Sequence, residues 1–529
     1  MTLTRRTFLW QAGLGTLSLW IQKGVAGIPA PSSALPRSTP QAEGVDPANI
    51  LAFLEAMNEG GFELHSFMLL RHGAVIAEGW WNPYGPHLNH TMYSLSKSFT
   101  TTAVGFAVAE QTLNLDDRVV SFFPDDLPES VDDNLSALRV RDLLTMSAGN
   151  EKEPTQTVTK EENWIRAFLA QKIAHRPGSV FMYNSAATYM CSAIVQKTTG
   201  QKVIDYLTPR LFEPLGIAGM RWETCPRGIN TGGWGLSIQS EALAKFGQLY
   251  LRKGQWGGRQ ILPASWIDEA TTFKIQQPGG DKPGRPRAQN DWLQGYCYQF
   301  WRCQHGAFRG DGAFGQFTII LPEQDAVIVM TGENKNMQGE LDLVWQHLLP
   351  AFGTKPVGGA GIAASELAEK LRSLELATPQ VESASATAAR IRGKVFRLEA
   401  NDLRLDTISF STRGDSCVFT ATAAGDIHAI TCGMGRWHLG ETTLPGTPPR
   451  LLAGGRPSGK IISKIAASAT WTDENTLEMT WRYTETPHRD TVTCRFDGDN
   501  LTIRFLNSIA AMKPNPKDER GSLQGRISM

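Results

Sequence analysis

The chain has 529 residues, of which 41% are hydrophobic and 20% are charged, and this composition excludes a chain that is mainly disordered. The 52 Lys and Arg residues balance the 52 Asp and Glu residues, so no net charge draws the chain toward nucleic acid or an anionic membrane. At about 100–200 residues per domain, the length predicts two to four domains.

The N-terminus carries the pattern of an export signal. Arg5 and Arg6 precede an apolar stretch at residues 12–21, and together they resemble a twin-arginine signal. The stretch is too short and too rich in glycine to span a bilayer, and small residues between 24 and 30 offer cleavage sites. We therefore predict a signal at residues 1–30, a periplasmic or secreted mature protein, and no transmembrane span.

An α+β domain is predicted to follow, over residues 31–353. Its first part, residues 31–45, is rich in Pro and Ser and has the composition of a linker. Hydrophobic spacing then predicts helices at 49–58, 94–112 and 337–349, a hairpin at 66–77, helix ends at 194–200 and 241–254, and strands at 317–321 and 325–330. Helices and strands mixed in this way favour one antiparallel sheet flanked by helices.

The chain changes character after this domain. Residues 354–390 combine Gly-rich and Ser-rich runs with a short charged helix near 365–376, which predicts a linker. Short β-prone runs then occur at 407–411, 417–422, 427–431, 477–483, 491–496 and 501–505. They predict a C-terminal antiparallel β domain over residues 391–529, either a barrel or a sandwich. Trp471 and Trp481 fit the core of such a domain better than a binding face.

The chemistry of the chain begins with an S-x-x-K pattern. Ser94 and Lys97 lie three residues apart at the start of an apolar helix, so their side chains share a face. A serine hydroxyl is a weak nucleophile until a base takes its proton, and desolvation lowers the pKa of a lysine enough for it to act as that base. The helix N-terminus adds N–H donors that favour developing negative charge. The same pattern also arises by chance, as a helix start beside a solvated lysine.

Two later segments support the catalytic interpretation. Tyr183 precedes a second apolar helix, and its phenol is suited to relay a proton to a leaving group. A buried aromatic residue with a bonded hydroxyl is the alternative. Residues 310–316 are rich in glycine and lead into the predicted strand at 317–321, so a substrate would fit along this backbone.

Taken together, the motifs resemble the serine β-lactamase and penicillin-binding superfamily, specifically its class C-like branch, over about residues 40–350. That branch also contains esterases, D-amino acid amidases and 6-aminohexanoate-dimer hydrolases. Three further segments resemble the family in the expected order: LRVRDLLTMSAG at 138–149, PRLFEPLGI at 209–217 and GGWGLS at 232–237. The resemblance implies a β-lactamase-like fold for the first domain.

The resemblance also implies a role for each motif residue. Ser94 would be the acylated nucleophile, Lys97 would help to activate it, and Tyr183 would act as a general base or acid. The backbone N–H groups of Ser94 and Ala313 would form the oxyanion hole. The implied reaction is two-step acyl transfer, in which water hydrolyses an acyl-enzyme. The residues placed to contact the substrate are Ser185, Asp311 and Gly312.

Two departures from the family pattern shape the expected function. The family usually places Asn two residues after the tyrosine, where this chain has Ser185, with Asn184 shifted by one. The third family motif usually begins with Lys or His, whereas Gly310 stands there, and the neighbouring Arg309 would point to the other face of a strand. We therefore expect a serine hydrolase for a small or peptide-like ester or amide rather than an efficient β-lactamase.

Two points about this expected function stay open. Asp311 either favours an amine-bearing substrate or is a turn aspartate. An acylatable sensor or binding protein with slow turnover, similar to a penicillin-binding protein, is the alternative to an enzyme.

The remaining motifs argue against other classes of protein. Residues 310–315 match G-x-G-x-x-G, but β-prone residues follow where a dinucleotide site needs a helix. The ten histidines and seven cysteines show no zinc spacing. We therefore predict no cofactor, no metal site and no nucleic-acid partner. Disulfides between Cys297 and Cys303, or between Cys417 and Cys432, are less favoured than buried thiols.

Overall fold

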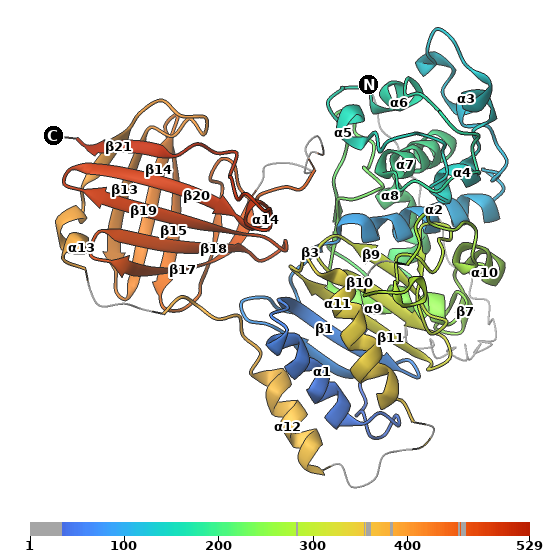
Figure 1. Ribbon diagram of the computed structural model, residues 1–529, viewed down its shortest axis with the longest axis horizontal. Helices are drawn as coiled ribbons and strands as arrows, with labels where there is room; N and C mark the ends of the chain where they lie inside the picture. The colour runs from blue at the N-terminus through green and yellow to red at the C-terminus, as the bar shows by residue number, and fades with distance from the viewer. Residues whose placement is uncertain are drawn as a thin grey trace, which may run out of the picture. The chain divides into compact units, whose positions relative to one another are not determined.

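The computed structural model of the chain describes residues 34–281, 284–353, 355, 361–380, 385–452, 455 and 462–528 (Figure 1). The predicted export signal at residues 1–30 lies outside these ranges. Among the helices that the structure describes, none has the length and apolar character needed to cross a membrane.

A six-stranded antiparallel sheet organises the first domain. Its strands run in the order β2-β1-β11-β10-β9-β8, so the hairpin near the start of the domain pairs with strands from its end. The predicted hairpin and the two later predicted strands are confirmed. The strand bounds are β1 Leu64–Arg71, β2 Ala74–Trp80, β8 Trp301–Arg302, β9 Phe308–Gly312, β10 Gln316–Leu321 and β11 Ala326–Gly332.

Helices cover both faces of this sheet. Side chains alternate along a strand, so Phe67 and Leu69 of β1 enter one core cluster while Met68 and Leu70 enter another. The first cluster joins the sheet to helices α1 Pro47–Glu59, α11 Met337–Leu343 and α12 Gly361–Arg372. The second joins it to α2 Ser96–Ala109, α7 Ser185–Thr199 and α9 Ser240–Leu251. The predicted α+β class is therefore confirmed.

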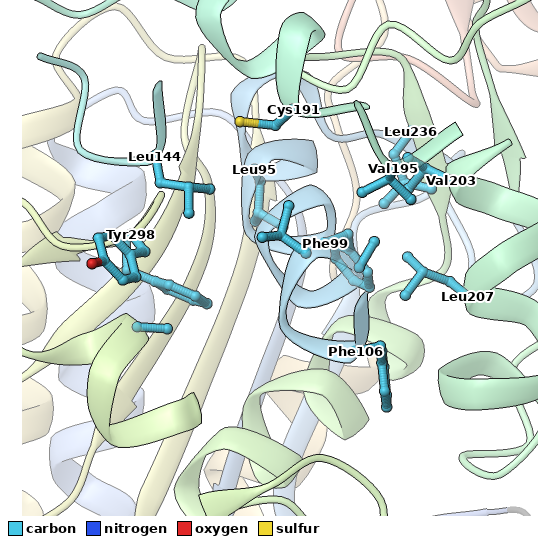
Figure 2. Close-up of a cluster of buried hydrophobic side chains, with 14 of the residues drawn as sticks. Leu95, Phe99, Phe106, Leu144, Cys191, Val195, Val203, Leu207, Leu236 and Tyr298 are labelled. Atoms are coloured by element: carbon cyan, nitrogen blue, oxygen red, sulfur yellow. The ribbon is translucent and has the colours of Figure 1, made fainter. Parts of the chain in front are cut away.

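Helix α2 lies at the centre of the second cluster, directly after a short 3-10 turn at Tyr93–Leu95. Figure 2 shows Phe99 and Phe106 of this helix among side chains of the neighbouring helices. Phe99 stacks on Phe246 of α9 with ring centroids 4.0 Å apart. Since almost the whole of α2 is buried, its first turn is held in a fixed position.

The other elements of the first domain are short. They form the helical region on which α2 packs and the small sheets around it. Their bounds are β3 His90–Thr91, α3 Asp133–Ala137, α4 Val140–Leu144, α5 Thr155–Val158, α6 Trp164–Leu169, α8 Val203–Leu207, β4 Arg221–Trp222, β5 Leu236–Ile238, β6 Gln255–Trp256, β7 Arg259–Gln260 and α10 Ala264–Thr271.

Two segments with linker composition pack against the first domain. In the segment 31–45, Leu35 is buried and Arg37 pairs with Glu78 and Glu241, so from residue 34 onward this stretch belongs to the domain. In the segment 354–390, helix α12 buries Leu367 in the same cluster as α1. A few apolar and charged side chains are enough to anchor a Pro-rich or Gly-rich segment, and composition alone does not show such contacts.

Over its described residues, the C-terminal β domain has ten strands, of which nine form a closed barrel. The tenth, β16, pairs with β17 at the edge of the closure. The strands are antiparallel neighbours except where β15 meets β17 in parallel, at Gly433–Ser468 and Met434–Ala469, and this pairing closes the barrel. Trp471 and Trp481 lie in its core, as predicted. The elements are α13 Ala386–Ile391, β12 Val395–Leu398, β13 Thr407–Arg413, β14 Ser416–Ala423, β15 Asp426–Met434, β16 His438–Thr442, β17 Ser463–Asp473, β18 Thr476–Tyr483, β19 Arg489–Asp497, β20 Asn500–Asn507, α14 Ser508–Ala511 and β21 Leu523–Ile527.

The described residues of the first domain and of the barrel belong to one compact unit. The turn between β18 and β19 makes several of the contacts between them. Thr91 donates its backbone N–H to the carbonyl of Glu485 at 3.0 Å, and Arg482 reaches Glu63 at 2.7 and 3.0 Å. Polar groups of the barrel therefore extend to the strand-like segment that leads to Ser94.

Candidate active site

Ser94 sits in the 3-10 turn that leads into α2, so its hydroxyl lies at the N-terminal end of a buried helix. The preceding residue, Tyr93, has φ +47°, a left-handed conformation that is uncommon outside glycine. This bend separates the backbone of β3 from the helix and presents Ser94, which is half-buried, at the junction. A nucleophile at such a position is accessible while its backbone N–H stays free of the helix ladder.

Lys97, one helical turn further on, has three hydrogen-bond partners. Its Nζ lies 3.0 Å from the Oγ of Ser94, 3.0 Å from the Oγ of Ser185 and 2.7 Å from the carbonyl oxygen of Gly233. The three partners come from the 3-10 turn before α2, from α7 and from the loop before β5, so the amine joins three separate parts of the fold. The structure thus brings Lys97 within proton-transfer distance of Ser94.

Burial sets the protonation of this lysine. Only 2% of Lys97 is exposed, and desolvation lowers its pKa to about 7. The negative charges of Glu153 and Asp311 act in the opposite direction and keep the pKa from falling further. At neutral pH, both the amine and the ammonium forms are therefore populated, which is the condition for a general base and acid.

Tyr183 completes the predicted trio. Its ring lies over Lys97, with Nζ 4.8 Å from the ring centroid, and it stacks on Trp301 at 5.6 Å. Burial raises the pKa of the Tyr183 phenol, and a hydrogen bond to Ser94 acts against that rise. The phenol is therefore protonated at neutral pH and is placed to donate its proton near Ser94 rather than to act as a resting phenolate.

The two residues after Tyr183 have different roles, because Asn184 caps α7 and Ser185 contacts Lys97. Asn184 is the N-cap of α7, where its side-chain oxygen accepts the N–H of Ala187 at 3.0 Å and its amide donates to Asn150 at 2.9 Å. Ser185 is the residue that reaches Lys97. Of these two residues, Ser185 contacts Lys97 and Asn184 caps the helix.

Strand β9 brings the third predicted segment beside Ser94. A methyl group on Gly312 would lie 2.1 Å from the carbonyl oxygen of Met92, so only a glycine lets β9 approach the turn before α2 this closely. Gly310 faces Ser98 and Leu95 in the same way. Ala313 directly follows Gly312, the residue of β9 that approaches the carbonyl of Met92, two positions before Ser94.

The opposite face of β9 carries a buried ion pair. The Nε of Arg309 lies 2.8 Å from a carboxylate oxygen of Asp311, and neither side chain is more than 8% exposed. Arg309 also lies 4.4 Å from the ring centroid of Trp292, and the residue points away from Gly310, as strand alternation predicted. An ammonium group on a substrate would have to compete with this guanidinium for Asp311.

Two polar contributors to the arrangement were missed by the sequence analysis. The carbonyl of Gly233 binds Lys97, although the surrounding segment had been noted only for its family resemblance. The carboxylate of Glu153 accepts the backbone N–H of Ser185 at 3.0 Å. Glu153 stands in an exposed loop with no motif around it, so no sequence signal could have identified it.

A cavity of about 320 Å³ adjoins the residue before the nucleophile. Tyr93, Trp222 and Trp234 line it from the first domain, and Tyr483 and Glu485 line it from the barrel. Burial raises the pKa of Glu223, another lining residue. The cavity is thus lined by a mixture of aromatic, aliphatic and charged side chains, and Tyr93 connects it to the predicted acylation site.

Other sequence features have structural explanations. Residues 310–315 form a β-hairpin rather than a strand followed by a helix, and all seven cysteines are free thiols. Over the described ranges, no group of three or more His, Cys, Asp or Glu side chains is placed to hold a metal ion.

Comparison with known proteins gives the family. The profile named Beta-lactamase matches residues 52–347, which is more than half of the chain and includes every residue of the predicted site. The chain belongs to the beta-lactamase family. The match ends before α12 and the barrel, which lie outside the matched residues.

Individual relatives agree with this assignment. The 6-aminohexanoate-dimer hydrolase of Paenarthrobacter ureafaciens is 25% identical over 283 residues, which cover 50% of this chain and 71% of the relative. Protein flp of Staphylococcus aureus strain MW2 is 26% identical over 136 residues, or 25% of this chain and 27% of the relative. A solved structure from Bacillus anthracis, provisionally named a 6-aminohexanoate-dimer hydrolase, has a TM-score of 0.50 at 20% identity and covers 61% of this chain and 89% of its own. The last match concerns the fold alone.

Proposed function

We propose that this protein is a serine hydrolase that cleaves an ester or an amide through an acyl-enzyme on Ser94. The observation that carries the proposal is the contact between Ser94 and Lys97, 3.0 Å long, with a lysine whose pKa is about 7. Membership of the beta-lactamase family and the similarity to a 6-aminohexanoate-dimer hydrolase support a hydrolytic reaction.

Acylation would proceed as follows. The neutral amine of Lys97 takes the proton of Ser94 while the serine oxygen attacks the carbonyl carbon of the substrate. The carbonyl oxygen becomes an oxyanion that accepts hydrogen bonds from the N–H groups of Ser94 and Ala313. The bond to the alcohol or amine then breaks, and Tyr183 protonates the leaving group. The proton held by Lys97 balances the one that Tyr183 delivers.

Deacylation would reverse the proton movements. The Tyr183 phenolate that acylation leaves behind takes a proton from a water molecule, and the water oxygen attacks the ester carbonyl of the acyl-enzyme. The same oxyanion hole stabilises the second tetrahedral intermediate. As the acid leaves, the ammonium of Lys97 returns its proton to the oxygen of Ser94, so Ser94, Lys97 and Tyr183 all end in their starting protonation states.

The substrate class follows from the charges near Ser94. Gly310 supplies no cation at the start of the third motif, and Arg309 is occupied by Asp311 on the other face of β9. A β-lactam carboxylate would therefore find no free cation from these two residues. We propose a substrate without an essential carboxylate at this position, such as a small or peptide-like ester or amide.

Covalent labelling of Ser94 tests the proposal. The protein is incubated with a fluorophosphonate and with a nitrophenyl ester, and the adduct is located by mass spectrometry. We expect one adduct at Ser94 and multiple turnovers of the ester. In Ser94→Ala, the rate of ester turnover should fall by on the order of a thousandfold. Labelling at another residue would reject the mechanism, and stoichiometric acylation without turnover would favour a slow-turnover sensor.

We also propose that the protein is exported through its twin-arginine pattern. The support is the sequence Arg5-Arg6 ahead of a short apolar stretch. Fractionation of cells that express the full chain and an Arg5→Lys/Arg6→Lys variant tests this proposal. We expect the variant to remain in the cytoplasm, and equal distribution of the two proteins would contradict export by this route.

A further inference from the structure

The predicted oxyanion hole has the same unusual feature on both of its sides. Tyr93, which precedes Ser94, has φ +47°, and Phe314, which follows Ala313, has φ +70°. Each of these non-glycine residues adopts the left-handed region, where the side chain costs on the order of 1 kcal/mol. Such conformations persist only where the surrounding structure holds them.

One histidine of the barrel contacts both of these residues. The hydroxyl of Tyr93 is hydrogen-bonded to the Nε2 of His488, and the ring of Phe314 meets the ring of His488 edge-on, with centroids 5.1 Å apart and planes at 90°. Tyr93 and Phe314 also contact each other, with centroids 5.5 Å apart. The three rings form a closed cluster that we call the aromatic brace, made of Tyr93, Phe314 and His488.

His488 is itself fixed in position and tautomer. It is fully buried, and its Nδ1 lies 2.6 Å from a carboxylate oxygen of Glu333. Since a carboxylate accepts, Nδ1 carries the proton and Nε2 is left as the acceptor for the hydroxyl of Tyr93. Glu333 is held in turn by Arg489 at 2.7 Å and by the hydroxyl of Ser508, both from the barrel.

The turn that contains Ala313 has further support from β11. The side-chain amide of Gln316 donates to the carbonyl of Ala313 at 3.0 Å and to that of Gly332 at 2.8 Å. The backbone N–H of Asn334 donates to the carbonyl of Phe314 at 3.0 Å. These bonds fix one side of the turn, and the aromatic brace connects the turn to the residue before Ser94.

We infer that His488 is a positioning residue for acylation: through Tyr93 and Phe314 it sets the separation of the two backbone N–H groups that receive the oxyanion. This inference rests on the proposed function and deepens it, because it makes the barrel a working part of the site. Oxyanion stabilisation depends on donors at hydrogen-bond distance from the developing charge, so a small shift of either donor slows acylation without weakening substrate binding.

A matched pair of tyrosines tests the inference. Tyr84 and Tyr93 are both buried, and the hydroxyl of each donates a hydrogen bond to the β18–β19 turn. Tyr84 donates to the carbonyl of Thr486 at 3.0 Å, and Tyr93 donates to His488. Tyr84→Phe and Tyr93→Phe therefore remove the same chemical group from the same interface. The full-length variants are compared by fluorophosphonate labelling rate, by kcat and KM on a nitrophenyl ester, and by melting temperature.

We expect Tyr93→Phe to lower the labelling rate and kcat by about tenfold to a hundredfold with KM within about threefold, and Tyr84→Phe to stay within about twofold of the wild type. His488→Asn keeps a group near Glu333 and loses the contact with Tyr93, so we expect it to match Tyr93→Phe. His488→Gln, which places an amide near the position of Nε2, should recover part of the rate.

The outcomes separate this inference from the proposed function. Equal rates for Tyr93→Phe and Tyr84→Phe in a wild type that labels at Ser94 would overturn the inference and leave the hydrolase intact. A wild type that does not label at Ser94 would overturn both. If His488→Asn does not fold, the comparison of the two tyrosine variants alone decides.

Discussion

The amine of Lys97 is surrounded by three acceptors, and its protonation state decides what it does for Ser94. An ammonium donates to Ser94, Ser185 and the carbonyl of Gly233 at once. A neutral amine donates to only two of them and has a lone pair left for the proton of Ser94. Chemistry at the residue scale is therefore controlled by the pKa of one buried lysine.

The pH dependence of acylation follows from this lysine. Since the pKa of Lys97 is about 7 and the neutral form is the base, the labelling rate of Ser94 should rise with pH through about 7 and then level off. Labelling at a series of pH values measures this limb. Lys97→Arg, which stays protonated throughout, should label on the order of a thousandfold more slowly. A flat profile in the wild type would mean that another group is the base.

Glu153 should affect the pH at which the labelling rate rises. Its negative charge raises the pKa of Lys97, so Glu153→Gln should move the midpoint of the pH profile to lower pH than in the wild type. Glu151→Gln, a matched change two residues away in the same exposed loop, serves as the control and should leave the midpoint in place. An unchanged midpoint in Glu153→Gln would show that solvent screens its charge.

At the scale of elements, close approach and packing decide which segments form the site. Strand β9 reaches the turn before α2 because Gly312 has no side chain, and α12 joins the first domain because Leu367 is buried with α1. Neither contact can be predicted from the helix or strand propensity of a single segment. Each can be tested by one substitution with a control from the same domain.

Gly312→Ala should push β9 away from Met92. The added methyl group would lie 2.1 Å from the carbonyl oxygen of Met92, so we expect a loss of about a hundredfold in labelling rate and about 1–3 kcal/mol of stability. Gly85→Ala is the control, because its nearest contact would be 3.9 Å away. Labelling kinetics and urea unfolding measure both effects, and equal behaviour of the two variants would refute the close approach.

Leu367→Ala should destabilise the first domain. The side chain is 3% exposed, and its truncation should cost about 2–4 kcal/mol. Ile362 lies on the same helix but is 79% exposed, so Ile362→Ala should change the free energy of unfolding by no more than about 0.5 kcal/mol. Urea unfolding measures the free energy of unfolding of both variants. An equal loss in Leu367→Ala and Ile362→Ala would show that α12 is a linker rather than part of the domain.

At the scale of the whole molecule, the barrel supplies polar partners to the first domain. Glu63 accepts from Arg482 at 2.7 Å and from Arg489 at 3.2 Å, and Glu333 accepts from Arg489 and His488. Breaking a buried charged contact by removing one side leaves an uncompensated charge, which is costly unless water replaces the partner. The two domains are therefore coupled near Ser94.

Removal of the barrel tests this coupling. A chain that ends at residue 380 keeps the six-stranded sheet and both of its helical layers, so we expect a folded protein by circular dichroism. Without His488, its labelling rate at Ser94 should fall by about tenfold or more. A truncated protein that labels as fast as the full chain would show that the barrel has no part in acylation.

The sequence predicted well whatever depends on nearby residues. Ser94 and Lys97 share a face because they are three positions apart at the start of a helix, and six strands of the β domain follow from short β-prone runs. Strands β12, β16, β17 and β21 were not predicted. Composition gave no sign that Arg37, in the segment 31–45, and Leu367, in the segment 354–390, contact the first domain. The sequence also assigned no role to Gly233 or Glu153, because their contacts with α2 and α7 join distant parts of the chain.

By itself, the sequence determined the α+β class, the order of the motifs and the identity of Ser94, Lys97 and Tyr183 as candidates, since local periodicity and spacing are written in consecutive residues. Only the tertiary structure decided that Lys97 is desolvated, that Arg309 pairs with Asp311, and that β15 meets β17 to close a barrel rather than a sandwich. The physical reason is that burial, charge pairing and strand closure depend on residues that meet only after the chain has folded.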